Sequence, residues 1–233
     1  MLDVFKSLFT SNKKSSISFY SFYKKMVKWR ESKVFPYSFN LPEIITLPTD
    51  FWGQVTKIYK QTDSDGKERA ISLFWADDEL VLTSVVKGDE RSVSSKHNVN
   101  VKYVNHPTKK EYLRRELLVD GKVRKRKDIY YKKVPKKISV KYLFNMHTHP
   151  AHIYSDGTKR YGFFSLQDIK SFLLSNAVVT GLVTDKLWLL VRTSETPNDV
   201  GSILETDITL ENLKERFNIV VYSAEFKKNA LRV

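Results

Sequence analysis

The spacing of apolar side chains along the chain predicts four helices. The first has apolar residues at i, i+3, i+4 and i+7, positions that share one face of a helix. These residues are Phe19, Phe22, Tyr23 and Met26. A second helix is expected to begin at Thr49 or Asp50 and to end before Gly66, because Thr and Asp favour helix starts and glycine interrupts helices. Two more helices are expected over residues 165–174 and near residues 210–217.

Alternating and continuous apolar runs predict the strands. An Asp-Gly pair at residues 120–121 joins two such runs, and this pair is a strong hairpin signal. Residues 138–146 are largely apolar, as expected for a strand buried on one or both faces. Residues 151–162 are interpreted as a polar loop. The expected strands are 68–75, 79–86, 98–104, 111–119, 122–131, 138–146, 177–184, 187–193 and 219–223. This order of elements favours an α+β or three-layer fold.

Composition indicates a folded chain with few candidate chemistries. Of 233 residues, 41% are hydrophobic and 13% aromatic, enough for a sizeable core and against general disorder. The chain has no cysteine, which excludes disulfides, a thiol nucleophile and Cys-ligated zinc sites. A metal would therefore need His, Asp or Glu ligands. The histidines are His97, His106, His147, His149 and His152.

The positive charge is concentrated in two segments. The chain has a formal net charge of +14, with +6 in residues 1–41, +11 in residues 96–137 and −3 in the rest. Such segments suit nucleic acid, an acidic protein surface or an anionic membrane surface. A lysine-rich face that only meets solvent is an equally simple interpretation.

The chain shows no expected membrane segment. Its first residues lack the continuous apolar core of a signal peptide. The most apolar stretch, residues 176–191, contains Asp185 and Lys186 and is too short to span a bilayer. A cytoplasmic protein without a membrane span is therefore expected.

Two short patterns are candidates for chemistry. In a strand, His147 and His149 would point to the same side, about 6.6–6.8 Å apart along the chain, so that both rings could reach one metal ion. Taken alone, such a pair is more often a surface feature or part of a core. On a helix, Ser165 and Asp168 would share a face. Taken alone, that pair resembles a capping box.

Together, these patterns carry a family resemblance. His147, His149 and Pro150 at a strand end are followed by a loop and then by Ser165 and Asp168 at a helix start. This arrangement resembles the JAMM motif of the JAB/MPN family of zinc metallopeptidases. The family pattern adds a glutamate at the start of an earlier strand. Glu68 lies at the corresponding place, after a helix and before an apolar run, and the resemblance covers roughly residues 45–223.

The resemblance implies a fold, a cofactor and a reaction. The implied fold is the cytidine-deaminase-like three-layer core, with a mixed β-sheet flanked by helices. The implied cofactor is one zinc ion per chain, with His147, His149 and Asp168 as metal ligands and a fourth position open to water. Glu68 would act as general base and Ser165 would stabilise the oxyanion. The implied reaction is hydrolysis of a peptide or isopeptide bond at the C-terminus of a ubiquitin-like modifier.

Three segments extend the family pattern. Residues 1–41 are expected to form a basic, aromatic N-terminal appendage to a metallopeptidase domain over 42–233. Within that domain, 96–137 is interpreted as an inserted basic hairpin and 151–164 as an enlarged loop. In deubiquitinase-type members, insertions at these two places hold the modifier and guide its tail. The expected partner is therefore a ubiquitin-like protein or its conjugates. The hairpin could contact an acidic protein surface or nucleic acid.

Other functions are compatible with the same resemblance. RadC-like relatives are linked to DNA, and some MPN members are inactive scaffolds that usually lack a ligand. A cell-wall peptidase is less favoured, because the chain shows no export signal. Within the site, Glu79 and Glu90 are rival candidates for the base, and Glu68 could be a solvated charge. His106 and His152 are expected to be bystanders.

Overall fold

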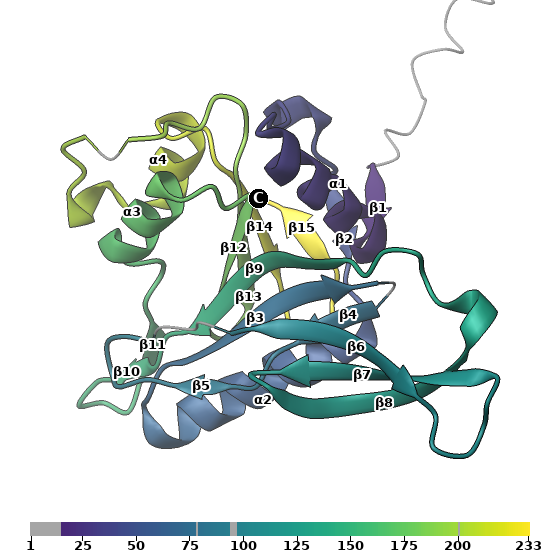
Figure 1. Ribbon diagram of the computed structural model, residues 1–233. Coiled ribbons are helices and arrows are strands. Elements are labelled where there is room, and N and C mark those ends of the chain that lie inside the picture. The colour runs from purple at the N-terminus through teal and green to yellow at the C-terminus, as the bar shows by residue number, and fades with distance from the viewer. Residues whose placement is uncertain (1–14, 78, 94–96, 200) are drawn as a thin grey trace, which may run out of the picture.

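The computed structural model describes residues 15–77, 79–93, 97–199 and 201–233, and its architecture is mixed α/β (Figure 1). A ten-stranded mixed sheet has the order β1-β2-β15-β14-β13-β12-β9-β3-β4, with β5 paired to β3. Two smaller sheets, β6-β7-β8 and β10-β11, complete the described β-structure. The class is compatible with the predicted α+β fold.

The bounds of the elements follow the predicted pattern closely. The described helices are α1 (Phe19–Ser32), α2 (Thr49–Asp65), α3 (Leu166–Leu174) and α4 (Leu210–Glu215). The described strands are β1 (Ser16–Ser18), β2 (Ile44–Thr46), β3 (Arg69–Ala76), β4 (Glu79–Leu82), β5 (Val86–Lys87), β6 (Val99–Asn105), β7 (Tyr112–Val119), β8 (Lys122–Tyr130), β9 (Val140–Thr148), β10 (Ala151–Ile153), β11 (Lys159–Tyr161), β12 (Val179–Val183), β13 (Leu187–Val191), β14 (Val220–Ala224) and β15 (Ala230–Arg232). The predicted strand over 79–86 is shorter and divided between β4 and β5.

Helices cover both faces of the large sheet. Along β13, Leu187, Leu189 and Val191 point into the core that holds α1 and α2. The alternate residues Trp188 and Leu190 belong to the core around α3 and α4. Because strand side chains alternate between faces, the two helix pairs lie on opposite sides of the sheet.

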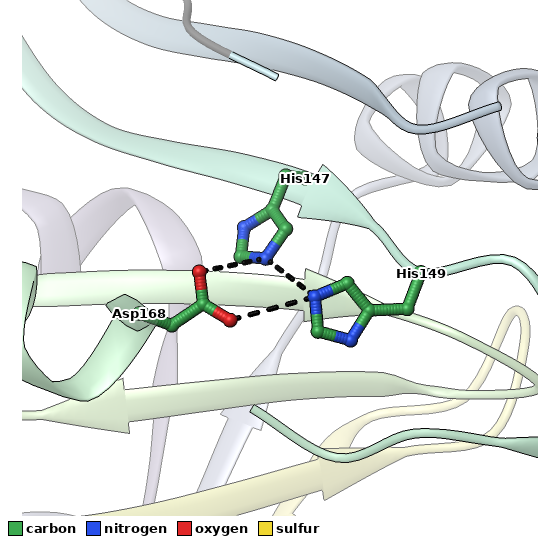
Figure 2. A group of neighbouring side chains, drawn as sticks. All are labelled: His147, His149 and Asp168. Atoms are coloured by element: carbon green, nitrogen blue, oxygen red, sulfur yellow. Dashed lines mark hydrogen bonds and ion pairs between the residues drawn. The ribbon is translucent and has the colours of Figure 1, made fainter. Parts of the chain in front are cut away.

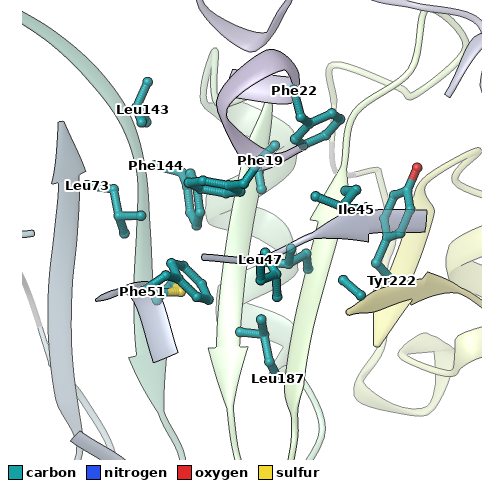
Figure 3. Packing of buried hydrophobic residues seen from close by; sticks show 14 of the residues in the cluster. Phe19, Phe22, Ile45, Leu47, Phe51, Leu73, Leu143, Phe144, Leu187 and Tyr222 are labelled. Carbon is teal, nitrogen blue, oxygen red and sulfur yellow. The ribbon is translucent and has the colours of Figure 1, made fainter. Parts of the chain in front are cut away.

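The predicted apolar face of α1 is confirmed. Its buried residues are Phe19, Phe22, Tyr23 and Met26. Figure 3 shows Phe19 close to Phe51 of α2 and Phe22 close to Tyr222 of β14, with ring centroids 5.3 and 6.4 Å apart. β1 also pairs with β2 in parallel. The described part of residues 1–41 is thus packed against the rest of the protein, while residues 1–14 lie outside the described residues.

The basic segment folds as a three-stranded sheet, β6-β7-β8. The predicted turn joins β7 to β8, and both turn residues have positive φ, 51° at Asp120 and 75° at Gly121, as two-residue hairpin turns require. One face of the sheet packs on β3 and β4. The residues of this contact are Phe74, Ala76, Val81, Val99, Val101, Leu117 and Val119.

The segment after Pro150 differs from the prediction of a polar loop. It contains the β10-β11 hairpin, in which Ala151 pairs with Tyr161. The Tyr161 hydroxyl forms a hydrogen bond with the Tyr59 hydroxyl of α2 at 2.8 Å, and Lys159 forms an ion pair with Asp63 at 2.8 Å. These contacts with α2 favour strands in a segment whose polar sequence gives little strand signal.

A buried arginine fixes the end of α3. The guanidinium of Arg192 (residue 1% exposed) donates to the carbonyl oxygens of Phe172, Leu173 and Ser175, where the helix ends. It also donates to backbone carbonyls before β12 and after β13. Carbonyls at a helix C-terminus lack intrahelical partners, and a cation there also meets the negative end of the helix dipole. Arg192 therefore positions the helix whose first turn carries Asp168.

β9 and β12 approach each other closely beside the histidines. They pair in parallel through Met146 and Gly181, then through the next two residues of each strand. A Cβ atom built at Gly181 would lie 2.5 Å from Cγ of Met146, which is itself fully buried. Glycine is favoured here because any side chain would collide with the buried Met146 side chain, which would have to move.

Gly181→Ala is expected to destabilise the protein by about 1–3 kcal/mol, the usual range for overpacking a buried contact. The matched control is Gly53→Ala within α2, where an added Cβ meets no atom within 4 Å. That variant should stabilise by about 0.5–1 kcal/mol, because glycine is unfavourable inside a helix. Urea denaturation measures both changes. Equal stabilities for the two variants would contradict the close approach of β9 and β12.

Within the described residues, no helix has both the length and the apolar character needed to cross a bilayer.

Candidate functional site

Three of the predicted site residues meet at one point (Figure 2). His147 lies at the end of β9, His149 follows just beyond it, and Asp168 lies in the first turn of α3. The two Nε2 atoms are 3.1 Å apart. Asp168 Oδ1 lies 3.2 Å from Nε2 of His147, and Oδ2 lies 3.4 Å from Nε2 of His149. The strand pair and the helix pair predicted separately thus form one group.

The group fits the donor set of a metal ion. Two imidazole nitrogens and a carboxylate are a common set of three protein ligands for catalytic zinc. Ligand atoms about 2.0–2.1 Å from a tetrahedral zinc ion lie about 3.3 Å from one another. The two Nε2 atoms are 3.1 Å apart, each has a different Asp168 oxygen within 3.2–3.4 Å, and one ligand atom from each residue lies within 4.8 Å of the others. His147, His149 and Asp168 could therefore hold a metal ion together. The identity of such an ion as zinc is a prediction.

Within the group, Asp168 and His149 each shift the pKa of the other toward its charged form. Burial alone would raise the pKa of Asp168, but hydrogen bonds from His147 and His149 outweigh it and hold this pKa well below its usual range. Burial would lower the pKa of His149, yet the hydrogen bond and charge of Asp168 raise it above its usual value. The site therefore keeps Asp168 ionised, as a metal ligand must be.

Glu68 lies beside this group. It precedes β3, which runs antiparallel to β9 with Ala70 opposite His147, and this register brings Glu68 toward His149. Its Oε1 atom is 3.8 Å from Nε2 of His149. Burial raises the pKa of Glu68, although the neighbouring histidines act in the opposite direction. The structure thus brings a buried carboxylate with increased basicity next to the three candidate ligands.

Ser165 forms the capping box that its spacing suggested. Its Oγ accepts a hydrogen bond from the Asp168 backbone N–H at 3.2 Å. Its own N–H and hydroxyl both donate to Asp168 Oδ2, each at 2.8 Å. In this arrangement Ser165 starts α3 and orients a candidate ligand at the same time, and its hydroxyl proton points to Asp168.

A buried hydrogen-bond network, absent from the sequence prediction, links Arg69, which follows Glu68, to Thr148, which lies between the two histidines. Thr148, between the two histidines, lies 2.6 Å from the Thr62 hydroxyl of α2 and accepts from the Arg69 N–H at 2.9 Å. The Arg69 guanidinium donates to both carboxylate oxygens of Asp65 at 2.7 Å. Asp65 ends α2 and Arg69 begins β3, so the helical i,i+4 rule did not apply to this pair, and nothing in the sequence connects it to Thr148.

The enlarged segment 151–164 also contributes to the site. The backbone of Gly162, just after β11, forms a hydrogen bond with the His149 ring. Because Nε2 of His149 faces Asp168, the other ring nitrogen is left for this bond. Such contacts fix ring orientation in metal sites. The β10-β11 hairpin therefore supports a candidate ligand as well as flanking it.

The group opens into a large cleft of about 750 Å³. Glu68, Glu90 and His152 line it together with the three candidate ligands, and so does part of α3. The rival base Glu79 lies elsewhere, with Arg115 and Lys125 as ion-pair partners. His97 and His106 pair with Asp120 and Asp128 of the basic sheet, away from the cleft.

The basic sheet contains internal ion pairs besides its excess of positive charge. On β8, Arg126 pairs with Glu116 at 2.9 Å. Asp128 lies within ion-pair distance of Lys109 and Arg114, at 3.4 and 3.6 Å. Glu116 and Asp128 are already counted in the net charge of +11 over residues 96–137, so these pairs leave the positive charge of the segment unchanged.

Comparison of the chain with known proteins gives no match. No protein-family model, no curated protein and no solved structure matches it. The interpretation of the site therefore depends on the described residues and their geometry.

Proposed function

We propose that the protein is a zinc-dependent (iso)peptidase of the JAB/MPN (JAMM) type, which hydrolyses a peptide or isopeptide bond at the C-terminus of a ubiquitin-like modifier. One observation carries the proposal. His147, His149 and Asp168 each offer a ligand atom, these atoms lie close enough together to share one metal ion, and Glu68 lies beside them. The finer fold assignment, a JAB/MPN three-layer core, belongs to the same proposal.

In the proposed reaction, the metal ion and Glu68 have different roles. A zinc ion held by the three ligands would supply Lewis acidity and a nucleophile near neutral pH. Glu68 would accept the proton of the attacking water and pass it to the leaving amine, as a general base and then a general acid. Its burial and raised pKa suit a group that must both take and release a proton.

Ser165 has two roles in the proposal. It orients Asp168 through the hydrogen bonds described above. Stabilising the oxyanion of the tetrahedral intermediate would require its hydroxyl hydrogen to turn from Asp168 toward the cleft. Loss of one oxyanion donor typically lowers the rate by about 10²–10³.

The proposal is preferred to the two alternatives on the same observations. An inactive scaffold would not need a complete ligand set with a buried carboxylate beside it. Nucleic-acid binding through residues 96–137 finds less support, since it rests on positive charge alone, and charge alone carries no sequence readout. We therefore favour a ubiquitin-like protein or its conjugates as the partner.

Zinc-loaded protein is expected to contain about one zinc ion per chain and to cleave fusions or conjugates of at least one ubiquitin-like protein. Elemental analysis measures the metal, and gel-based cleavage assays measure the activity. Removal of zinc with a chelator should abolish cleavage, and added zinc should restore it. A protein that binds no zinc, or that binds it and cleaves no member of a broad panel, would contradict the proposal.

A further inference from the structure

The cleft continues well beyond the candidate metal group. It is lined along β9 by His147, then Asn145, then Tyr142, and at its far end by Arg30 of α1. The intervening residues Leu143, Phe144 and Met146 belong to the core on the other face of the sheet. Leu143 is the extra residue of a β-bulge, and the bulge is what returns Tyr142 to the face of Asn145 and His147. One face of a single strand therefore forms a continuous floor from the metal group to Arg30.

The edge of β9 along this floor is open. β9 pairs with β3 from Val140 to His147, but in the described structure its pairing with β12 begins only at Met146. Val179 and Thr180 of β12 line the cleft on the opposite side of the gap. The side-chain oxygen of Asn145 is buried and has no hydrogen-bond partner among the described residues. An extended peptide in this gap could form main-chain hydrogen bonds with an open strand edge, a common mode of peptide recognition.

Arg30 is held in place at the end of the floor. Its Nη1 donates to the Tyr142 carbonyl at 2.6 Å, and its guanidinium lies over the Tyr142 ring, 4.7 Å from the centroid. Among the described residues, no carboxylate forms an ion pair with it. A guanidinium has five N–H donors, so most of them are left for a ligand. Planar guanidinium groups of this kind prefer carboxylates, which they bind through two parallel hydrogen bonds.

The other charged groups of the cleft lie at its opposite end. Glu90 and Arg91 belong to the loop next to Glu68. The backbone N–H of Glu68 donates a hydrogen bond to the Asp89 carbonyl of this loop. Near Arg30 the lining is uncharged, with Ser175 and Asn176 among its polar members. The far end is therefore a polar pocket with one fixed positive charge.

We propose that Arg30 forms a carboxylate-binding subsite, which selects substrates whose extended segment carries an Asp or Glu side chain about four to five residues from the bond to be cleaved. The inference rests on the proposed function for the position of that bond. The spacing follows from β9, because Tyr142 and His147 are five positions apart with one bulged residue between them. Four to five residues of an extended peptide, about 13–17 Å, would span the same distance. The N-terminal segment thus supplies specificity to a site built by the rest of the chain.

Binding of short peptides tests the subsite separately from catalysis. The probes are fluorescein-labelled twelve-residue peptides that share one sequence of Gly, Ser and Leu. In the first series a single Asp stands at a different position in each peptide. In the second series Lys stands at the same positions. Fluorescence anisotropy with wild-type protein, zinc-loaded and zinc-free, should show at least one Asp peptide binding about ten- to hundredfold more tightly than its Lys counterpart. Arg30→Ala should remove the difference, and Arg30→Glu should favour the Lys series.

The controls separate the possible failures. Lys28→Ala makes the same charge change on an exposed position of α1 and should leave the preference for Asp intact. Arg30→Lys keeps the charge but not the planar fork, and thermal melts of all variants show whether each one folds. Equal affinities for the two series, or a preference that survives Arg30→Ala, would overturn the subsite. Because the readout is binding, these outcomes are distinct from a failure to bind zinc or to cleave modifier fusions, which would overturn the proposed function.

Discussion

Glu68→Gln is expected to lower the cleavage rate by about 10²–10⁴, the usual contribution of a positioned general base, while one zinc ion per chain remains bound. Glutamine has nearly the same shape as glutamate but cannot accept the proton. The Glu68 carboxylate lies 3.8 Å from Nε2 of His149 and outside the group of three candidate ligands, so the substitution leaves those candidate ligands in place. Single-turnover cleavage and elemental analysis on the same sample measure the two effects.

Two further variants make this result specific. His149→Ala removes a ligand and should lose both the zinc and the activity. Glu90→Gln makes the same chemical change as Glu68→Gln at the rival carboxylate, which is exposed, and should reduce the rate far less. A Glu68→Gln variant that retains its rate, or that loses zinc along with activity, would show that Glu68 is not the general base.

Arg192→Met is expected to destabilise the protein by about 3 kcal/mol or more. The substitution keeps a long side chain but leaves several buried carbonyls at the end of α3 without a donor, and each orphaned buried group costs about 1–3 kcal/mol. These carbonyls belong to Phe172, Leu173 and Ser175, among others. Urea denaturation of the zinc-free protein measures the loss without a contribution from the metal.

Arg216→Met is the matched control, since it removes the same charge from an arginine whose side chain is 48% exposed and paired with Asp207. Exposed ion pairs contribute about 0–1 kcal/mol, so this variant should remain close to the wild type. Similar stabilities for the two variants would mean that the carbonyls at the end of α3 find water or other donors, and that Arg192 does not fix this helix.

Much of the fold was predictable because its elements carry local signals. The i, i+3, i+4, i+7 spacing from Phe19 to Met26 was sufficient for α1 and its buried face. The Asp120-Gly121 pair was sufficient for the turn between β7 and β8. The short strands β1, β2, β15, β10 and β11 were not predicted. Three-residue strands have too little sequence to show a period, and they are stabilised by partners far away in the chain.

The candidate site likewise contains some residues that local spacing predicts and others that it does not. His147 with His149, and Ser165 with Asp168, are pairs whose spacing on a strand or helix could be read directly. The position of Arg30 at the end of the cleft could not, because it donates to a carbonyl 112 residues further along the chain. The contact of Thr148 with Thr62 spans 86 residues and is equally invisible in the sequence.

The carboxylate of Asp168 contacts both the start of α3 and the histidines. Oδ2 accepts from the backbone and hydroxyl of Ser165 at the start of α3 and also lies near His149, while Oδ1 faces His147. Selection for a folded protein alone would therefore preserve this aspartate in a descendant that does not bind a metal. Neither histidine caps a helix in the described structure, although the Gly162 backbone contacts the His149 ring. In any lineage that descends from this protein, retention of both histidines would be better evidence for the proposed metal site than retention of the aspartate.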